Sequence, residues 1–342
     1  MFEQRINIDR MEQAVALFGS FDENVKLIEQ VYGVKIVGRD SEIKVSGEPE
    51  SVAKAVKTIE SLLTLINRGE ALSEQNVRYC ISMVNEGSEE KIETLAGDCI
   101  CVTSKGKPVK PKTFGQKKYC NTIKENTITI GVGPAGTGKT YLAVAMAVTA
   151  FRAQQVNRII LTRPAVEAGE KLGFLPGDMK EKIDPYLQPL YDALQDMIPA
   201  AKLKEYMELN IIQIAPLAFM RGRTLNDAVV ILDEAQNTTT QQIKMFLTRM
   251  GMNTKMIVTG DMTQIDLPIS QTSGLVQALR ILKGVKGISF VELNKKDIVR
   301  HKLVERIVDA YEKFDKERKT AKEGARVTNE KTEVINNKPK AN

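Results

Sequence analysis

The sequence contains no tryptophan and a single histidine, His301. A zinc site built on several histidines and a Ser-His-Asp triad both depend on imidazole groups, so this chain nearly excludes both kinds of site. The cysteines also lack the CxxC spacing of metal ligands. We therefore expect reduced, mostly structural thiols at Cys80, Cys99, Cys101 and Cys120.

Long apolar runs are missing as well. No continuously apolar stretch approaches the roughly 20 residues that a transmembrane helix needs, and the N-terminal sequence MFEQRINIDR lacks the apolar core of a signal peptide. We expect a cytoplasmic protein without a membrane partner.

Positive charge is present, but it is concentrated at one end. The net charge is +6, and residues 313–342 hold nine Lys or Arg against five Asp or Glu. The rest of the chain is close to neutral, so bulk charge argues only faintly for a nucleic-acid partner. Residues 319–342 are polar, charged and poor in apolar side chains, and we expect this tail to be disordered.

The first 69 residues are typical of a small α+β domain. Its expected elements follow the order β-α-α-β-β-α, at residues 6–8, 11–18, 23–32, 34–37, 43–45 and 49–66. This order resembles a KH domain, a module in which a GXXG loop between the first two helices clamps single-stranded RNA. Here that loop runs from Gly19 to Asp22, and the Asp22 carboxylate would repel an RNA backbone. RNA binding by this loop and a protein-docking or oligomerisation role both stay open.

A connector over residues 70–109, with one helix and a small β element, leads to a larger domain over 110–318. Short β-branched runs alternate there with helical segments, which is the pattern of buried parallel strands. The expected strands cover residues 127–132, 158–162, 211–214, 229–232, 255–259 and 288–291.

Between the first of these strands and an apolar helix lies GPAGTGKT, which fits the phosphate-loop pattern GxxxxGK[ST]. Glycines allow backbone N–H groups to converge on phosphate oxygens, and the helix that follows turns its positive end toward the anion. Lys139 would contact the β- and γ-phosphates, and the Thr140 hydroxyl would reach Mg²⁺. The predicted nucleotide-binding residues are Gly133, Pro134, Ala135, Gly136, Thr137, Gly138, Lys139 and Thr140.

A second polar site follows the apolar run over 228–232, where the chain continues Asp233-Glu234. Asp233, at the end of a strand, is placed to reach Mg²⁺, and Glu234 is the expected general base for an attacking water. A base held over the γ-phosphate favours hydrolysis over small-molecule phosphorylation.

Two glutamines are further candidates. Gln264 follows the next strand in TGDMTQ and could sense the γ-phosphate, or it could belong to a plain turn built on an Asx bond from Asp261. Gln116 precedes the nucleotide strand and could pair with both the donor and the acceptor edge of adenine, or it could be a surface residue of a helix. The adenine alternative favours ATP over GTP.

Several blocks together resemble the PhoH-like ATPases. They are GPAGTGKT, residues 161–194, ILDEAQNTTTQQIKMFLTRMG, VTGDMTQIDLP and DIVRH, within residues 110–314. The resemblance implies an α/β fold with a single RecA-like P-loop NTPase core and a parallel sheet, related to superfamily 1 helicases and preceded by the small KH-like domain. It also implies ATP and Mg²⁺ as ligands and a role in RNA metabolism.

A single RecA-like core lacks the second core that donates an arginine finger in superfamily 1 helicases. Such a finger accelerates hydrolysis by ~10³–10⁵-fold. We therefore expect a homo-oligomer, such as a hexameric ring. Arg300 in DIVRH is the leading candidate, either as a finger acting on a neighbouring subunit or as a sensor of the γ-phosphate in its own subunit, and Arg249 and Arg223 follow it. Arg163, Lys171 and Lys180 would contact a nucleic acid crossing the top of the sheet, or they would form a solvated rim.

The sequence thus favours an ATPase that couples hydrolysis to remodelling of RNA or of a ribonucleoprotein, as helicases do. The alternative is a nucleotide-dependent switch that regulates a partner ribonuclease or a ribosomal component without unwinding. A small-molecule kinase is disfavoured by Glu234.

Overall fold

The computed structural model describes residues 2–39, 42–67, 72–88, 92, 99–164, 179–268 and 270–300, and also 303–304, 306–307 and 310–311. The chain divides into two units, Met1–Ile298 and Val299–Asn342, and the elements below belong to the first. The tail over 319–342 and the segment 165–178, which includes Lys171, lie outside the described residues. Within the described part of the chain, no helix is both long and apolar enough to cross a membrane.

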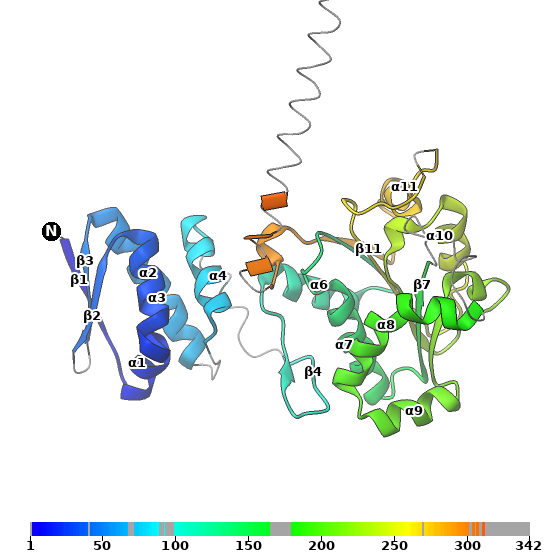
Figure 1. Cartoon of the computed structure of the whole chain (residues 1–342), viewed down its shortest axis with the longest axis horizontal. Coiled ribbons are helices and arrows are strands. Elements are labelled where there is room, and N and C mark those ends of the chain that lie inside the picture. Colours follow the sequence, from blue (N-terminus) through cyan, green and yellow to red (C-terminus); the bar gives the residue numbers. More distant parts are fainter. Residues whose placement is uncertain are drawn as a thin grey trace, which may run out of the picture. The chain divides into compact units, whose positions relative to one another are not determined.

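The N-terminal domain has the predicted β-α-α-β-β-α order. Its sheet has the strand order β1-β3-β2, with both pairs antiparallel. Alternate strand residues such as Ile6, Ile43 and Val45 are buried in one apolar cluster with helix residues, so α1, α2 and α3 cover one face of the sheet (Figure 1). The elements are β1 (Phe2–Asn7), α1 (Met11–Phe18), α2 (Glu23–Tyr32), β2 (Lys35–Arg39), β3 (Glu42–Gly47) and α3 (Pro49–Asn67).

The segment predicted as a connector is divided between two apolar clusters. Helix α4 (Glu74–Asn85) contributes Val77, Cys80 and Ile81 to the cluster of the N-terminal domain. The two-stranded pair β4 (Cys101–Val102) and β5 (Pro108–Val109) instead packs in a cluster of the larger domain. The packing therefore extends each core into residues 70–109, and the domain boundaries stay a prediction.

The larger domain contains a six-stranded parallel sheet with the order β11-β6-β10-β9-β7-β8. Every predicted strand of this domain is present. Strand β10 lies between β6, which leads into the phosphate loop, and β9, which ends before Asp233. This is the strand order of a RecA-like core, so the predicted fold class is confirmed. The strands are β6 (Ile128–Val132), β7 (Arg158–Arg163), β8 (Ile212–Pro216), β9 (Ala228–Leu232), β10 (Lys255–Gly260) and β11 (Ile288–Glu292).

Both faces of this sheet are covered by helices and buried. Successive strand residues point to opposite faces, so they pack in two different apolar clusters. In β9, Val229 and Ile231 pack in one cluster, whereas Val230 and Leu232 pack in the other. The first cluster includes α6 (Phe114–Glu125), α7 (Lys139–Arg152), α8 (Met179–Met197) and α9 (Ala200–Glu208); the second includes α10 (Thr240–Leu247) and α11 (Gly274–Ile281). The carboxyl ends of β6, β9 and β10 consequently lie side by side at one edge of the sheet.

The four cysteines are free thiols, as predicted. Cys80, Cys101 and Cys120 are buried, and burial raises the pKa of the Cys80 thiol to about 12. Cys99 is exposed, so three of the four cysteines are buried, in agreement with the expectation of mostly structural thiols.

Candidate functional site

The phosphate loop connects the fully buried strand β6 to the N-terminus of α7. Two glycines are required by its geometry. Gly138 has φ 76°, in the left-handed region that glycine adopts without strain, and it immediately precedes the first helical residue. A Cβ atom on Gly133 would lie 2.5 Å from the Leu293 carbonyl oxygen, so only glycine fits there.

Lys139 places its ammonium group inside the curve of this loop. Its Nζ donates to the carbonyl oxygens of Gly133, at 2.6 Å, and Pro134, at 2.9 Å, and it lies 3.3 Å from the Thr137 hydroxyl. The residue is only 8% exposed. The cation is thus held beside the backbone N–H groups of the loop, where a phosphate would meet both kinds of donor.

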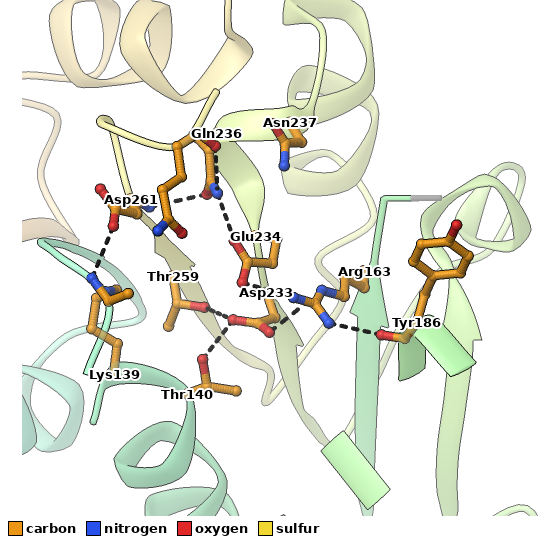
Figure 2. A network of polar contacts seen from close by, with 12 residues as sticks. Lys139, Thr140, Arg163, Tyr186, Asp233, Glu234, Gln236, Asn237, Thr259 and Asp261 are labelled. Atoms are coloured by element: carbon orange, nitrogen blue, oxygen red, sulfur yellow. Dashed lines mark hydrogen bonds and ion pairs between the residues drawn. The ribbon is translucent and has the colours of Figure 1, made fainter. Parts of the chain in front are cut away.

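Asp233 joins the phosphate loop to the centre of the sheet (Figure 2). Its Oδ1 accepts hydrogen bonds from the Thr140 hydroxyl and from the Thr259 hydroxyl, each at 2.6 Å. The carboxylate is almost fully buried. Three strands therefore supply this contact: β6 leads to Thr140, β9 to Asp233, and β10 carries Thr259.

The chemistry of Thr140 and Asp233 fits Mg²⁺. Both offer hard oxygen ligands, and Mg²⁺ is commonly held by one or two carboxylates together with substrate phosphates and water. Among the described residues, no group of three or more His, Cys, Asp or Glu could hold a metal ion by itself. A site completed by the substrate's phosphates is consistent with this finding.

Glu234 follows in the left-handed conformation, with φ 54° and ψ 39°, which is uncommon for a residue other than glycine. Its Oε1 accepts from Arg163 Nη2 at 2.7 Å, and its Oε2 accepts from Gln236 Nε2 at 2.5 Å. Arg163 Nε also lies 3.8 Å from Asp233 Oδ2. Non-glycine residues in this region of φ and ψ are concentrated at functional sites, and Figure 2 shows Glu234 inside such a polar network.

The loop after β10 makes hydrogen bonds both to the phosphate loop and to Gln236, the partner of Glu234. Asp261 accepts from the Ala135 backbone N–H at 2.8 Å and from the Thr263 N–H at 2.9 Å, the second being the Asx bond considered above. Gln236 accepts from the Asp261 N–H and donates to the Gln264 carbonyl. A change at the phosphate loop can therefore reach Glu234 through hydrogen bonds alone.

A cavity of about 270 Å³ opens at this edge of the sheet. It brings together residues from the phosphate loop, the end of β9 and the end of β10, including the predicted Lys139, Glu234 and Gln264. Its lining residues are Ala135, Gly136, Gly138, Lys139, Thr140, Tyr141, Asp233, Glu234, Gly260, Asp261 and Gln264.

Tyr141 is the one aromatic residue among those lining residues. Its hydroxyl donates to Asp196 Oδ2 at 2.5 Å. Burial, and next the hydrogen bond to the Asp196 carboxylate, raise the pKa of Tyr141, so the phenol stays protonated near neutral pH. Tyr141 is therefore no candidate for the general base.

Gln116 is buried at 4% exposure, so the alternative of a surface helix residue is wrong. Its Nε2 donates to the Thr137 carbonyl at 3.1 Å, and its Oε1 accepts from the Lys112 backbone N–H at 2.7 Å. The side chain thus contacts the phosphate loop from α6. Its predicted role as an adenine reader stays a prediction.

The family model described as PhoH-like protein matches residues 108–312. A PhoH-like protein of Bacillus subtilis (strain 168) is 53% identical over 302 residues, which cover 88% of this chain and 95% of that protein. The chain belongs to the PhoH-like protein family.

Two more relatives support this assignment. A PhoH-like protein of Mycobacterium tuberculosis (strain ATCC 25618 / H37Rv) is 51% identical over 88% of this chain and 85% of its own length. Protein PhoH of Escherichia coli (strain K12) is 39% identical over 78% of this chain and 73% of its own length. A solved Sulfolobus solfataricus SWI2/SNF2 ATPase core in complex with dsDNA is similar at a TM-score of 0.29, with 17% identity over 43% of this chain and 30% of that one.

The PhoH-like family assignment agrees with the sequence motifs. The alternative of a solvated rim is wrong for Arg163, because its side chain is 20% exposed and paired with Glu234. The motifs do not point to Gln236, which is 1% exposed and links Glu234 to the loop after β10. The run of polar residues that continues past Glu234 was the available signal.

Arg223 and Arg249 are not among the described residues that line this cavity. Arg300 belongs to the second unit, and its role stays a prediction. Arg223 and Arg249 make local contacts, with the Gln213 side chain and the Met245 carbonyl respectively. The Lys180 side chain lies outside the described part of the chain.

Proposed function

We propose that this PhoH-like protein binds ATP with Mg²⁺, hydrolyses it, and couples hydrolysis to the remodelling of RNA or of a ribonucleoprotein. The observation that carries the proposal is the shared cavity, which Lys139, Thr140, Asp233 and Glu234 line together. These residues supply, in that order, a cation for phosphate, two oxygen ligands for the metal, and a carboxylate for the attacking water.

The division of tasks follows from the geometry. Lys139 and the loop N–H groups would hold the β- and γ-phosphates, and Thr140 with Asp233 would hold Mg²⁺. When bound, the metal would neutralise charge that develops on the phosphate oxygens. Glu234, one residue past Asp233, would orient a water for attack and accept its proton. Gln264 would lie near the γ-phosphate, and Gln116 would read adenine from the other side of the loop.

The RNA partner is supported by the family assignment and by the KH-like order of the N-terminal domain, rather than by its predicted loop. In that loop Phe21 and Asp22 both have positive φ, Phe21 is 94% exposed, and the nearby Lys26 donates to the Phe21 carbonyl. The basic side chain is thus engaged with the loop itself.

Turnover measured with and without RNA tests the proposal. We expect single-stranded poly(U) to raise the rate of phosphate release several-fold at saturating ATP and Mg²⁺, because an enzyme that couples hydrolysis to RNA remodelling hydrolyses ATP faster when RNA is bound. Double-stranded DNA of equal nucleotide concentration is the control. Absence of ATP binding would reject the nucleotide site, whereas ATP hydrolysis that no RNA alters would reject only the RNA coupling.

One observation favours the second candidate, a nucleotide-dependent switch acting on a ribonuclease or a ribosomal component. Both Glu234 oxygens accept hydrogen bonds from protein donors, which fixes the orientation of the carboxylate and takes up part of its accepting capacity. Slow hydrolysis that RNA does not stimulate, combined with nucleotide-dependent binding of a protein partner, would select this function.

We further propose a homo-oligomer, such as a hexameric ring, in which Arg300 completes the site of a neighbouring subunit. In that case Arg300→Ala lowers the turnover rate at saturating ATP by ~10³-fold or more and leaves nucleotide affinity within about threefold. Light scattering with and without nucleotide reports the subunit number. Wild-type turnover in Arg300→Ala would remove Arg300 from this role, and a monomer under every condition would remove the ring.

A further inference from the structure

Arg163 lies at the carboxyl end of β7, beside the strand that ends at Asp233. The parallel register pairs Thr162 with Leu232, so Arg163 emerges next to the Asp233-Glu234 pair. Its guanidinium bonds to Glu234 through Nη2 and to the Tyr186 carbonyl of α8 through Nη1, each at 2.7 Å (Figure 2). One rigid fork thus joins the end of β9 to a helix on one face of the sheet.

Arg163 does not belong to the described residues that line the cavity, although Glu234 does. The position of Arg163 in the fold therefore does not suggest a direct contact with a triphosphate. Its effect on the reaction has to pass through the carboxylates that it contacts, of which Glu234, at 2.7 Å, is nearer than Asp233, at 3.8 Å.

The hydrogen bonds on Glu234 define a resting arrangement. Oε1 accepts from Arg163 and Oε2 from Gln236, so the two donors fix the orientation of the carboxylate and leave one lone-pair site on each oxygen. A general base has to turn a lone pair toward the attacking water. The Gln236 amide is itself fixed, because it accepts from the Asp261 N–H and donates to the Gln264 carbonyl. Arg163 is the partner whose release would free an oxygen without breaking the loop after β10.

We propose that Arg163 is a positioning residue that holds Glu234 in this resting arrangement, and that efficient hydrolysis requires Glu234 to leave Arg163. The inference rests on the proposed ATPase function and specifies how the same site is regulated.

The contact with α8 indicates what could move Arg163. Pro189 has no backbone N–H, so the Pro185 carbonyl loses its donor within the helix, and helices bend where this happens. The Tyr186 carbonyl, one residue further on, accepts from Arg163. A shift of α8 relative to β9 would therefore draw the guanidinium away from Glu234, which gives a partner bound on α8 a mechanical route to the base.

The test is basal ATP turnover, measured without nucleic acid at saturating ATP and Mg²⁺. In Arg163→Ala we expect kcat to rise by about tenfold, the factor typical of losing one charged hydrogen bond, with KM unchanged within about twofold. Arg163→Lys should give an intermediate rise, because an ammonium can hold the carboxylate but cannot bridge it to the Tyr186 carbonyl. Arg158→Ala is the matched control, since Arg158 starts the same strand and its side chain donates to the Asn226 carbonyl instead of a carboxylate of the site.

A double variant identifies the path of the effect. Arg163→Ala combined with Glu234→Gln should be as slow as Glu234→Gln alone, because the gain depends on the freed carboxylate. Equal or lower kcat in both Arg163 variants, or a gain that survives in the double variant, overturns the inference. A misfolded protein cannot produce a higher kcat, so the expected direction excludes a merely structural effect. If the wild-type protein neither binds nor hydrolyses ATP, the proposed function itself fails. A nucleotide-binding measurement on the wild-type protein distinguishes this outcome from failure of the Arg163 inference alone.

Discussion

Replacing Glu234 by glutamine should lower ATP turnover by about 10²–10⁴-fold while nucleotide binding persists. The loss corresponds to removing a general base, and the groups expected to bind phosphate and Mg²⁺ remain. Binding should persist because Lys139, Thr140 and Asp233 make their contacts independently of the Glu234 side chain. Phosphate release measures the first effect, and titration with a fluorescent ATP analogue measures the second.

Glu234→Gln changes the hydrogen bonds around residue 234 as well as its charge. A glutamine that keeps its oxygen on Arg163 turns its NH₂ toward Gln236 Nε2, which is a donor facing a donor. Gln236 cannot reverse its amide without losing the Asp261 N–H. Glu234→Asp, which retains the charge on a shorter chain, separates these effects. Glu292→Gln is the control, because Glu292 is an exposed carboxylate at the end of β11, on the same edge of the sheet. Turnover of Glu234→Gln within threefold of wild type would show that another group activates water.

The elements of the larger domain could be predicted because their signals are local. Strands such as 255–259 are β-branched runs buried on both faces, and the phosphate loop follows one of them at a fixed spacing. Each of these features is specified by fewer than about 20 consecutive residues, so a single sequence suffices to find it.

The contacts between strands could not be predicted in the same way. Arg163 and Glu234 are 71 residues apart, and they meet because β7 pairs with β9. Spacing along the chain carries no information on that pairing, so Arg163 was placed at the edge of the sheet without its partner. Gln116 illustrates a second limit of prediction from sequence. The composition of α6 is that of an ordinary surface helix, whereas the burial of Gln116 depends on how this helix packs beside the phosphate loop.

Removing the ammonium group of Lys139 should weaken ATP binding by about 10²–10³-fold. Charged hydrogen bonds contribute ~1.5–3 kcal/mol each, and Lys139 is expected to make such bonds to two phosphates. The variant Lys139→Ala also removes the donor that now bonds to the Gly133 and Pro134 carbonyls, so part of the loss comes from a less ordered loop. Titration with a fluorescent ATP analogue measures the affinity, and Lys118→Ala, an exposed lysine of α6, is the control.

Thermal unfolding separates the two contributions of Lys139. A ligand that binds only the folded state stabilises it by RT ln(1 + [L]/Kd), so the increase in Tm caused by ATP should vanish in Lys139→Ala at concentrations that shift the wild-type protein. The Tm without nucleotide reports the loop alone. We expect it to fall by no more than a few degrees, since Lys139 itself lines the open cavity, from which water can take the place of its ammonium group. An unchanged ATP-induced shift would mean that the nucleotide binds without Lys139, and the phosphate loop would then lose its assigned role.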